Sequence, residues 1–255
     1  MVSMSKAKIE NRPRPKRFYA AANIAPHEQG FVITLDGKMV RTPAGKLLHC
    51  ISQQLGQAIA AEWEAQAEHI DTDTMPLTRL LNIALDRVEH DREALLADIV
   101  NYAETDLLCY RAPREENALG LPSANQKLRL LQLQHFDPIL AWAEETYGLH
   151  FVCTDGLVPV AQPAASREAI AALFAAANHH QLAALALMTP ILGSALLTLA
   201  VWKGRLSAQE ALAAAHLDEA VHAEQWGDDH EVVVKWAAKC RDVKAAAVFI
   251  SANGV

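Results

Sequence analysis

Apolar and polar residues alternate in the first part of the chain, and this pattern predicts β-strands. The segment GFVITLDGKMVRTPAGKLLHC, residues 30–50, has β-branched and apolar residues on both sides of Asp36–Gly37. That dipeptide favours a tight type I′ hairpin, because both central positions of the turn need a positive φ. A second turn at residues 43–45 is expected to lead to another short strand that ends near Cys50.

From Ser52 onward the apolar residues follow a helical period. An apolar stripe over residues 55–63 follows Ser52, which is the expected N-cap. Further helical runs are expected at about residues 77–88 and 91–102, followed by the strand-like segment LLCY at residues 107–110. The amino-terminal part therefore mixes strands with helices.

The chain beyond residue 123 has a mainly helical pattern, which is interrupted by the extended segments HFVCT and GLVPVAQP. Ser207 and Glu210 form a capping box, in which each side chain satisfies a backbone N–H at the start of a helix. The helix that begins there is expected to continue to about Trp226 and to end at Gly227.

These patterns predict a fold of the α+β class with two domains. A small N-terminal α/β domain with antiparallel hairpins is expected at residues 17–115, after a flexible basic tail at residues 1–16. A mainly helical C-terminal domain is expected at residues 116–255. The boundary is placed in the loop APREENALGLP, whose proline and charge content is typical of a linker between domains.

Residues 182–202 contain no charged side chain and are long enough to span a membrane. Thr189–Pro190 interrupts this stretch, and Gly193–Ser194 weakens it further. Two short buried helices explain the pattern as well as a membrane span does, and the rest of the chain is patterned as a globular protein. We therefore expect no integral membrane association.

The chain has 255 residues and a formal net charge of -7 at pH 7. It lacks the basic excess that binding to a phosphate backbone requires, so nucleic acid is not an expected partner. The four cysteines, at positions 50, 109, 153 and 240, form no C-x-x-C pair, and this pattern is typical of reduced thiols in a reducing compartment.

The common catalytic and nucleotide-binding motifs are missing from the sequence. It contains no complete phosphate-binding loop, G-x-G-x-x-G, G-x-S-x-G or H-E-x-x-H. Glu219 and His222 form a Glu-x-x-His, which places both side chains on one face of a helix, as in di-iron carboxylate bundles. Such a site needs a second copy, and the sequence holds none. The pattern is therefore more typical of a solvated acidic face, and a helical metalloenzyme using Glu219 and His222 with ligands from elsewhere is the alternative function.

Glu219 and Trp226 fall on one stripe of the expected C-terminal helix, so a carboxylate and an indole share a face. Such a face suits contact with a protein partner. The alternative is that Trp226 closes the core and Glu219 pairs with Arg79 or Arg87, because a buried carboxylate needs a partner. Core packing is also the default role of Trp63, which would anchor a partner only at the rim of a groove.

Several blocks of the sequence are long and chemically unusual, and they occur in the order GF-x-x-x-LDG, AIAAEW-x-AQ, MPLTRL-x-N-x-A-x-DRV, TDLL-x-YR and DE-x-x-x-x-E-x-WG-x-D. Together they resemble the assembly chaperones of the ATP synthase α subunit, the Atp-twelve family, from Arg17 to about Phe249. The resemblance implies a two-domain chaperone without enzymatic activity and without a cofactor. It also implies that the partner is the free α subunit of F-type ATP synthase, whose subunit interface is protected until assembly.

The resemblance also implies a set of partner-binding residues, which in this sequence are Glu219, Glu224, Trp226, Asp229, Asp218, Trp63 and Glu62. Glu219 is the first candidate. His222 stands where the family usually has glutamine, so the contact could depend on pH, because neutral imidazole can mimic an amide and imidazolium cannot. The short basic start favours the bacterial cytoplasm, with the mitochondrial matrix as the compartment if the protein is eukaryotic.

Overall fold

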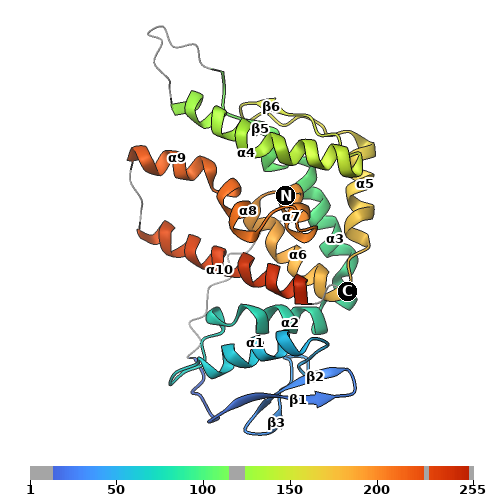
Figure 1. Ribbon diagram of the computed structural model, residues 1–255, viewed down its shortest axis with the longest axis vertical. Coiled ribbons are helices and arrows are strands. Elements are labelled where there is room, and N and C mark those ends of the chain that lie inside the picture. The colour runs from blue at the N-terminus through green and yellow to red at the C-terminus, as the bar shows by residue number, and fades with distance from the viewer. Residues whose placement is uncertain (1–13, 115–123, 227–229, 253–255) are drawn as a thin grey trace, which may run out of the picture.

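A small β-sheet and a stack of helices make up the protein, and they follow one another along its longest axis (Figure 1). The structure is a computed structural model that describes residues 14–114, 124–226 and 230–252. It confirms the α+β class, because antiparallel strands near the amino terminus are followed by a mainly helical region. The domain boundary expected at residues 115–116 lies outside the described residues and stays a prediction.

The sheet has four strands, and all of its pairs are antiparallel. In sequence order the strands are β1 (Ala22–His27), β2 (Gly30–Leu35), β3 (Lys38–Met39) and β4 (His49–Cys50). β2 is the central strand, because it pairs with the other three. β4 is the short strand that the pattern places near Cys50.

The predicted hairpin turn is present between β2 and β3. Asp36 and Gly37 have φ values of 47° and 77°, which are the positive angles that a type I′ turn needs. The pattern did not reveal β1, which contains Pro26. This strand pairs with β2 alone within the sheet, and a strand at such an edge tolerates proline, which cannot donate a hydrogen bond to a neighbour.

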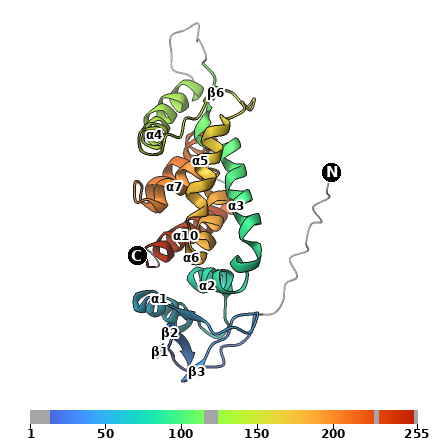
Figure 2. The same ribbon diagram turned by 90° about the vertical axis from the view of Figure 1, so that its right-hand side faces the viewer.

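Two helices lie between the sheet and the helical stack (Figure 2). α1 (Gln53–Glu64) packs against β1 and β2, and α2 (Pro76–Asp86) packs against α1, α6 and α10. Ser52 is the N-cap of α1, as expected, and its hydroxyl accepts a hydrogen bond from Leu55 N at 3.3 Å. A short 3₁₀ helix, η1 (Thr72–Thr74), precedes α2.

The strand expected at residues 107–110 is wrong for most of its length. The chain forms a 3₁₀ helix, η2 (Leu107–Cys109), and then a two-residue strand, β5 (Tyr110–Arg111), which pairs in parallel with β6 (Thr154–Asp155). The carboxylate of Asp106 accepts a hydrogen bond from Leu108 N at 3.0 Å, and this bond holds the backbone in a turn.

Helices make up the rest of the described chain. They are α3 (Val88–Glu104), α4 (Ala124–Tyr147), α5 (Ala164–Ala175), α6 (His179–Leu192), α7 (Ala195–Trp202), α8 (Ala208–Ala215), α9 (Leu217–Trp226) and α10 (His230–Ala252). α6 is at the centre, where it contacts α2, α3, α7, α8 and α10.

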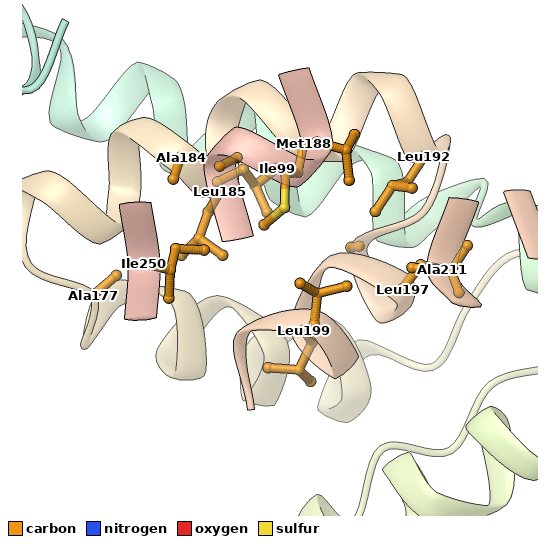
Figure 3. Close-up of a cluster of buried hydrophobic side chains, with 14 of the residues drawn as sticks. Ile99, Ala177, Ala184, Leu185, Met188, Leu192, Leu197, Leu199, Ala211 and Ile250 are labelled. Atoms are coloured by element: carbon orange, nitrogen blue, oxygen red, sulfur yellow. The ribbon is translucent and has the colours of Figure 1, made fainter. Parts of the chain in front are cut away.

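The apolar stretch at residues 182–202 forms the two short buried helices that the sequence allows, α6 and α7. They are separated at Gly193, whose φ is 63°, and not at Pro190, which lies inside α6. Figure 3 shows the buried cluster that they build, with Leu185, Met188 and Leu192 of α6, Leu197 and Leu199 of α7 and Ile250 of α10. Over the described ranges, no helix is both long and apolar enough to cross a membrane.

The single helix expected over residues 207–226 is wrong, because the chain bends at His216 and forms α8 and α9. The predicted capping box at Ser207 is present at the start of α8. The bend has a packing reason. Leu212 of α8 belongs to the main core, whereas Val221 of α9 packs in a separate small cluster with Leu128 of α4.

Candidate partner-binding site

Glu219 lies on the surface of α9 and is held near α10. Its side chain is 62% exposed, and its Oε2 is 3.6 Å from Nδ1 of His216. The ring of His216 stacks on the indole of Trp236 in α10, with 4.0 Å between the ring centroids and 16° between the planes. An exposed carboxylate is therefore positioned by an aromatic contact between two helices.

Asp218, the neighbouring candidate, contacts α4. Its Oδ1 accepts a hydrogen bond from Gln132 Nε2 at 3.0 Å, and Gln132 Oε1 in turn accepts one from Ala112 N at 2.7 Å. Gln132 is buried, so this chain of hydrogen bonds satisfies polar groups inside the protein. The contact makes Asp218 a residue that joins α9 to α4.

Glu219 does not pair with either of the arginines considered from the sequence. Arg79 forms a salt bridge at 2.5 Å with Asp242 of α10, and Arg87 forms one at 2.9 Å with Asp91 one turn along α3. The pairing of Glu219 with Arg79 or Arg87 is wrong, because the bend at His216 sends α9 towards α4 and leaves α10 beside α2.

Three of the expected partner-binding side chains cannot be placed. Asp229 lies outside the described residues. The backbones of Glu224 and Trp226 belong to α9, but their side chains lie outside the described part of the structure. The predictions for these residues stay predictions.

Beside α9, the first turns of α10 expose a run of valines. Val232, Val233 and Val234 are 50%, 46% and 55% exposed. Consecutive residues of a helix point in directions about 100° apart, so a partner can cover at most part of this run at one time. The run gives α10 an apolar surface that begins within about one turn of Trp236, whose indole stacks on His216 beside Glu219.

Glu62 is half-buried in α1 and binds the start of α2. Its Oε1 accepts a hydrogen bond from Leu77 N at 2.7 Å, and its Oε2 accepts one each from Thr78 N and Thr78 Oγ1 at 2.8 Å. Met75, the N-cap of α2, supplies no side-chain hydrogen bond, so Glu62 satisfies these N–H groups instead. Burial raises the pKa of Glu62, and the hydrogen bonds from Leu77 and Thr78 oppose that rise.

Trp63 lines a surface pocket at the sheet end of the protein. Its ring meets that of Tyr19 edge to face at 5.8 Å, and Tyr19 OH donates a hydrogen bond to Trp63 O at 2.6 Å. Phe18 and Met39, which line the same pocket, are 73% and 53% exposed. The indole therefore lies where a partner could contact it, and its role in binding stays a prediction.

The structure does not bring the two sets of candidates together. α1 carries Glu62 and Trp63 at the sheet end, whereas α9 lies farther along the axis, beyond α10 (Figure 1). The alternative metal site gains no support, because no three His, Cys, Asp or Glu side chains gather as metal ligands anywhere in the described ranges. His222 is exposed on α9.

Comparison with known proteins identifies the family to which this chain belongs. Residues 16–144 match the family of the ATP12 chaperone protein, a span of just over half the chain. The chain belongs to the ATP12 chaperone family. It is therefore a member of a family of chaperones, and the solved relatives extend the likeness over nearly its whole length.

Several solved structures share the fold of this chain. Atp12 from Paracoccus denitrificans is 32% identical, with a TM-score of 0.82 over 93% of this chain and 98% of that chain. A candidate chaperone protein from Agrobacterium tumefaciens is 38% identical, with a TM-score of 0.84 over 94% of this chain and 87% of that chain. An aspartate-to-lysine mutant of the Paracoccus protein is 32% identical and matches 93% of this chain and 97% of that chain with a TM-score of 0.81.

Sequence reasoning missed the residues that position Glu219. Trp236 and His216 are far apart in the sequence, and their stacking depends on the path of the chain between α9 and α10. Gln132 gives no local signal either, because nothing in the run LRLLQLQ of α4 marks one of its two glutamines as the buried one. The acidic motif was visible in the sequence, whereas its supports are tertiary contacts.

Proposed function

We propose that this protein binds the free α subunit of F-type ATP synthase and covers its subunit interface until the catalytic sector assembles. The observation that carries this proposal is the likeness, over nearly the whole chain, to Atp12 of Paracoccus denitrificans. The sequence blocks that resemble the family imply the α subunit as partner. A chaperone role needs no bond to be made or broken, and the residues discussed above suit contact with another polypeptide.

The surface of α9 and the start of α10 is the proposed contact region. It combines the exposed carboxylate of Glu219 with the exposed run at Val232–Val234. An unassembled subunit exposes an apolar interface that would otherwise aggregate, and apolar side chains beside a charge can cover such a surface and orient it. Glu219 is the proposed recognition residue, and Glu224, Trp226 and Asp229 are proposed to extend its surface.

A temporary contact must also be released. The β subunit can displace the chaperone when the final interface between subunits is larger and more apolar than the temporary one. A contact region that includes an exposed charge and a few half-exposed valines is consistent with moderate affinity, because rim charges contribute more to recognition than to total binding energy.

Co-expression tests the proposal. The α subunit is produced with and without this protein, and the soluble fraction is measured after lysis. We expect more soluble α subunit when the protein is present, together with recovery of both chains in one complex. Equal recovery of the α subunit in both cultures would show that the proposed function is wrong.

A further inference from the structure

Two cysteines face each other at the start of the small parallel ribbon. Cys109 comes directly before β5, and Cys153 comes directly before β6. Tyr110 pairs with Thr154 in parallel register, and Cys109, the last residue of η2, and Cys153 each come one residue before this pair. Neighbouring strands lie about 5 Å apart, so two cysteines that each precede a paired residue start from a separation close to the Cα range that a disulfide bridges.

The two thiols differ in exposure and in acidity. Cys109 is buried and Cys153 is exposed, and Cys153 Sγ lies 4.0 Å from the carbonyl oxygen of Leu108, the residue before Cys109. The hydrogen bond from Cys109 lowers the pKa of Cys153 to about 6, and the Arg111 guanidinium acts in the same direction against the effect of burial. The same contact, with burial, raises the pKa of Cys109. At neutral pH Cys153 is therefore mainly a thiolate, the nucleophilic form.

Cys153 opens onto a pocket with an excess of positive charge. The charged residues that line it are Arg111, Arg114, Arg129, Asp137 and Asp155. Each aspartate is held in salt bridges with these arginines, at 2.6 Å for Arg111–Asp137 and for Arg129–Asp155. Three arginines against two aspartates leave one positive charge in excess, which favours an anionic reactant.

We propose that Cys153 and Cys109 form a reversible dithiol site that reacts with low-molecular-weight disulfides bearing carboxylates, of which glutathione disulfide is the test case. Cys153 is the attacking thiol and Cys109 is the resolving thiol. The geometry is that of a redox-sensitive pair, in which an exposed acidic thiol lies beside a second cysteine. This inference does not rest on the identity of the chaperone's partner.

The chemistry balances in two exchange steps. The Cys153 thiolate attacks one sulfur of glutathione disulfide, the S–S bond of that molecule breaks, and glutathione thiolate leaves and takes a proton from water. Cys109 then loses its proton to water and attacks the Cys153 sulfur, which expels the second glutathione thiolate. The two cysteines lose two electrons, and one glutathione disulfide becomes two glutathione thiols.

The other two cysteines serve as internal controls. Cys50 is buried, and burial raises its pKa to about 11. Burial also raises the pKa of Cys240, which is half-buried in α10. Both are therefore mainly protonated at neutral pH, and neither thiol has the acidity of Cys153.

The first test follows the product of oxidation. The reduced full chain is treated with glutathione disulfide at pH 7, free thiols are alkylated, and peptides are mapped by mass spectrometry. We expect a Cys109–Cys153 disulfide with Cys50 and Cys240 alkylated, and a stable glutathione adduct on Cys153 in Cys109→Ala. Preferential reaction at Cys50 or Cys240, or a lasting adduct on Cys153 with Cys109 free in the unmutated chain, would overturn the proposal.

The second test separates acidity from exposure and needs no oxidant. The rate of alkylation of Cys153 by iodoacetamide is measured against pH in the unmutated chain, in Cys109→Ala and in Cys240→Ala. We expect a midpoint near pH 6 in the unmutated chain and in Cys240→Ala. In Cys109→Ala it should move towards about 8.5, the ordinary thiol value. A midpoint above pH 8 in the unmutated chain would contradict the pairing.

A third measurement tests the charge of the reactant. The rates with glutathione disulfide and with the neutral 2-hydroxyethyl disulfide are compared at low and high salt. We expect glutathione disulfide to react faster at low salt, with the advantage reduced at high salt because added ions screen the arginines. Equal rates at low salt would overturn the assignment of a carboxylate-bearing reactant.

Discussion

Asp218 and Glu219 are adjacent on α9, but their carboxylates have different surroundings. Asp218 accepts a hydrogen bond from Gln132 of α4, whereas Glu219 is 62% exposed and 3.6 Å from the ring of His216. Substituting Asp218 would disturb the packing of α9 on α4 as well as any binding. Glu219 is the better residue for a test of recognition.

We predict that Glu219→Lys weakens binding of the α subunit by on the order of tenfold or more, because a reversed charge at an exposed contact opposes recognition while leaving packing intact. Glu168→Lys on α5 is the matched control, since Glu168 is also exposed and α5 lies across the helical stack from α9 in Figure 1. Both variants are titrated with the α subunit, and circular dichroism checks the fold. Equal affinities of the two variants would remove Glu219 from the site.

Glu62 supports the fold, whatever it contributes to binding. In Glu62→Gln one oxygen is replaced by NH₂, which cannot accept the hydrogen bonds that the carboxylate receives from Leu77 and Thr78. We expect the free energy of unfolding in urea to fall by about 1–3 kcal/mol. The exposed Glu68, replaced by Gln, is the control and should change it by less than about 0.5 kcal/mol. An unchanged free energy of unfolding in Glu62→Gln would contradict the capping role of Glu62.

At the scale of elements, the sequence predicted the start of α8 but not the bend between α8 and α9. The capping box at Ser207 and Glu210 is a local signal, and it correctly marks the start of α8. The bend at His216 has no proline or glycine to announce it. It arises because Leu212 and Val221 pack in different clusters, and such a requirement exists only in the folded protein.

Asp106 connects two elements and carries a pH dependence. Its Oδ1 accepts a hydrogen bond from Leu108 N in η2, and its Oδ2 accepts one from Leu196 N at the start of α7, each at 3.0 Å. Burial raises the pKa of Asp106 to about 6, although the hydrogen bonds from Ser194 and the backbone oppose the rise. The folded protein therefore holds this proton more tightly than the unfolded chain, whose aspartate pKa is about 3.9.

This difference predicts a change of stability with pH. Asp106 contributes most to the free energy of unfolding below about pH 4, and that contribution falls as the pH rises through about 6. The asparagine side chain of Asp106→Asn does not ionise in this pH range. We expect the unmutated protein to lose on the order of 2–3 kcal/mol relative to Asp106→Asn between pH 4 and pH 7, measured by urea unfolding. A constant difference between the two proteins would contradict the raised pKa.

At the scale of the whole molecule, local patterns predicted the class of the fold and much of its order. The Asp36–Gly37 turn and the Ser52 cap depend on neighbouring residues, and both are where the sequence indicates. The apolar stretch at residues 182–202 correctly gave two buried helices, although the break is at Gly193. The supports of Glu219 were not predictable, because Trp236 reaches His216 only through tertiary packing.

The arrangement of the whole molecule also suits a chaperone. The main core joins residues of the sheet, such as Ile33, to residues of the last helix, such as Phe249. α9 instead packs mainly on α4, through the small cluster that includes Leu128 and Val221. The part of the proposed contact surface on α9 thus lies outside the main core, so a partner can bind there without disturbing that core.

Direct titration of the purified α subunit with the purified protein, followed by sedimentation velocity, tests the central claim most directly. The account predicts a soluble complex of one copy of each chain, less aggregation of the α subunit, and release of the protein when purified β subunit is added. Separate sedimentation of the two chains, with unchanged aggregation of the α subunit, would contradict it.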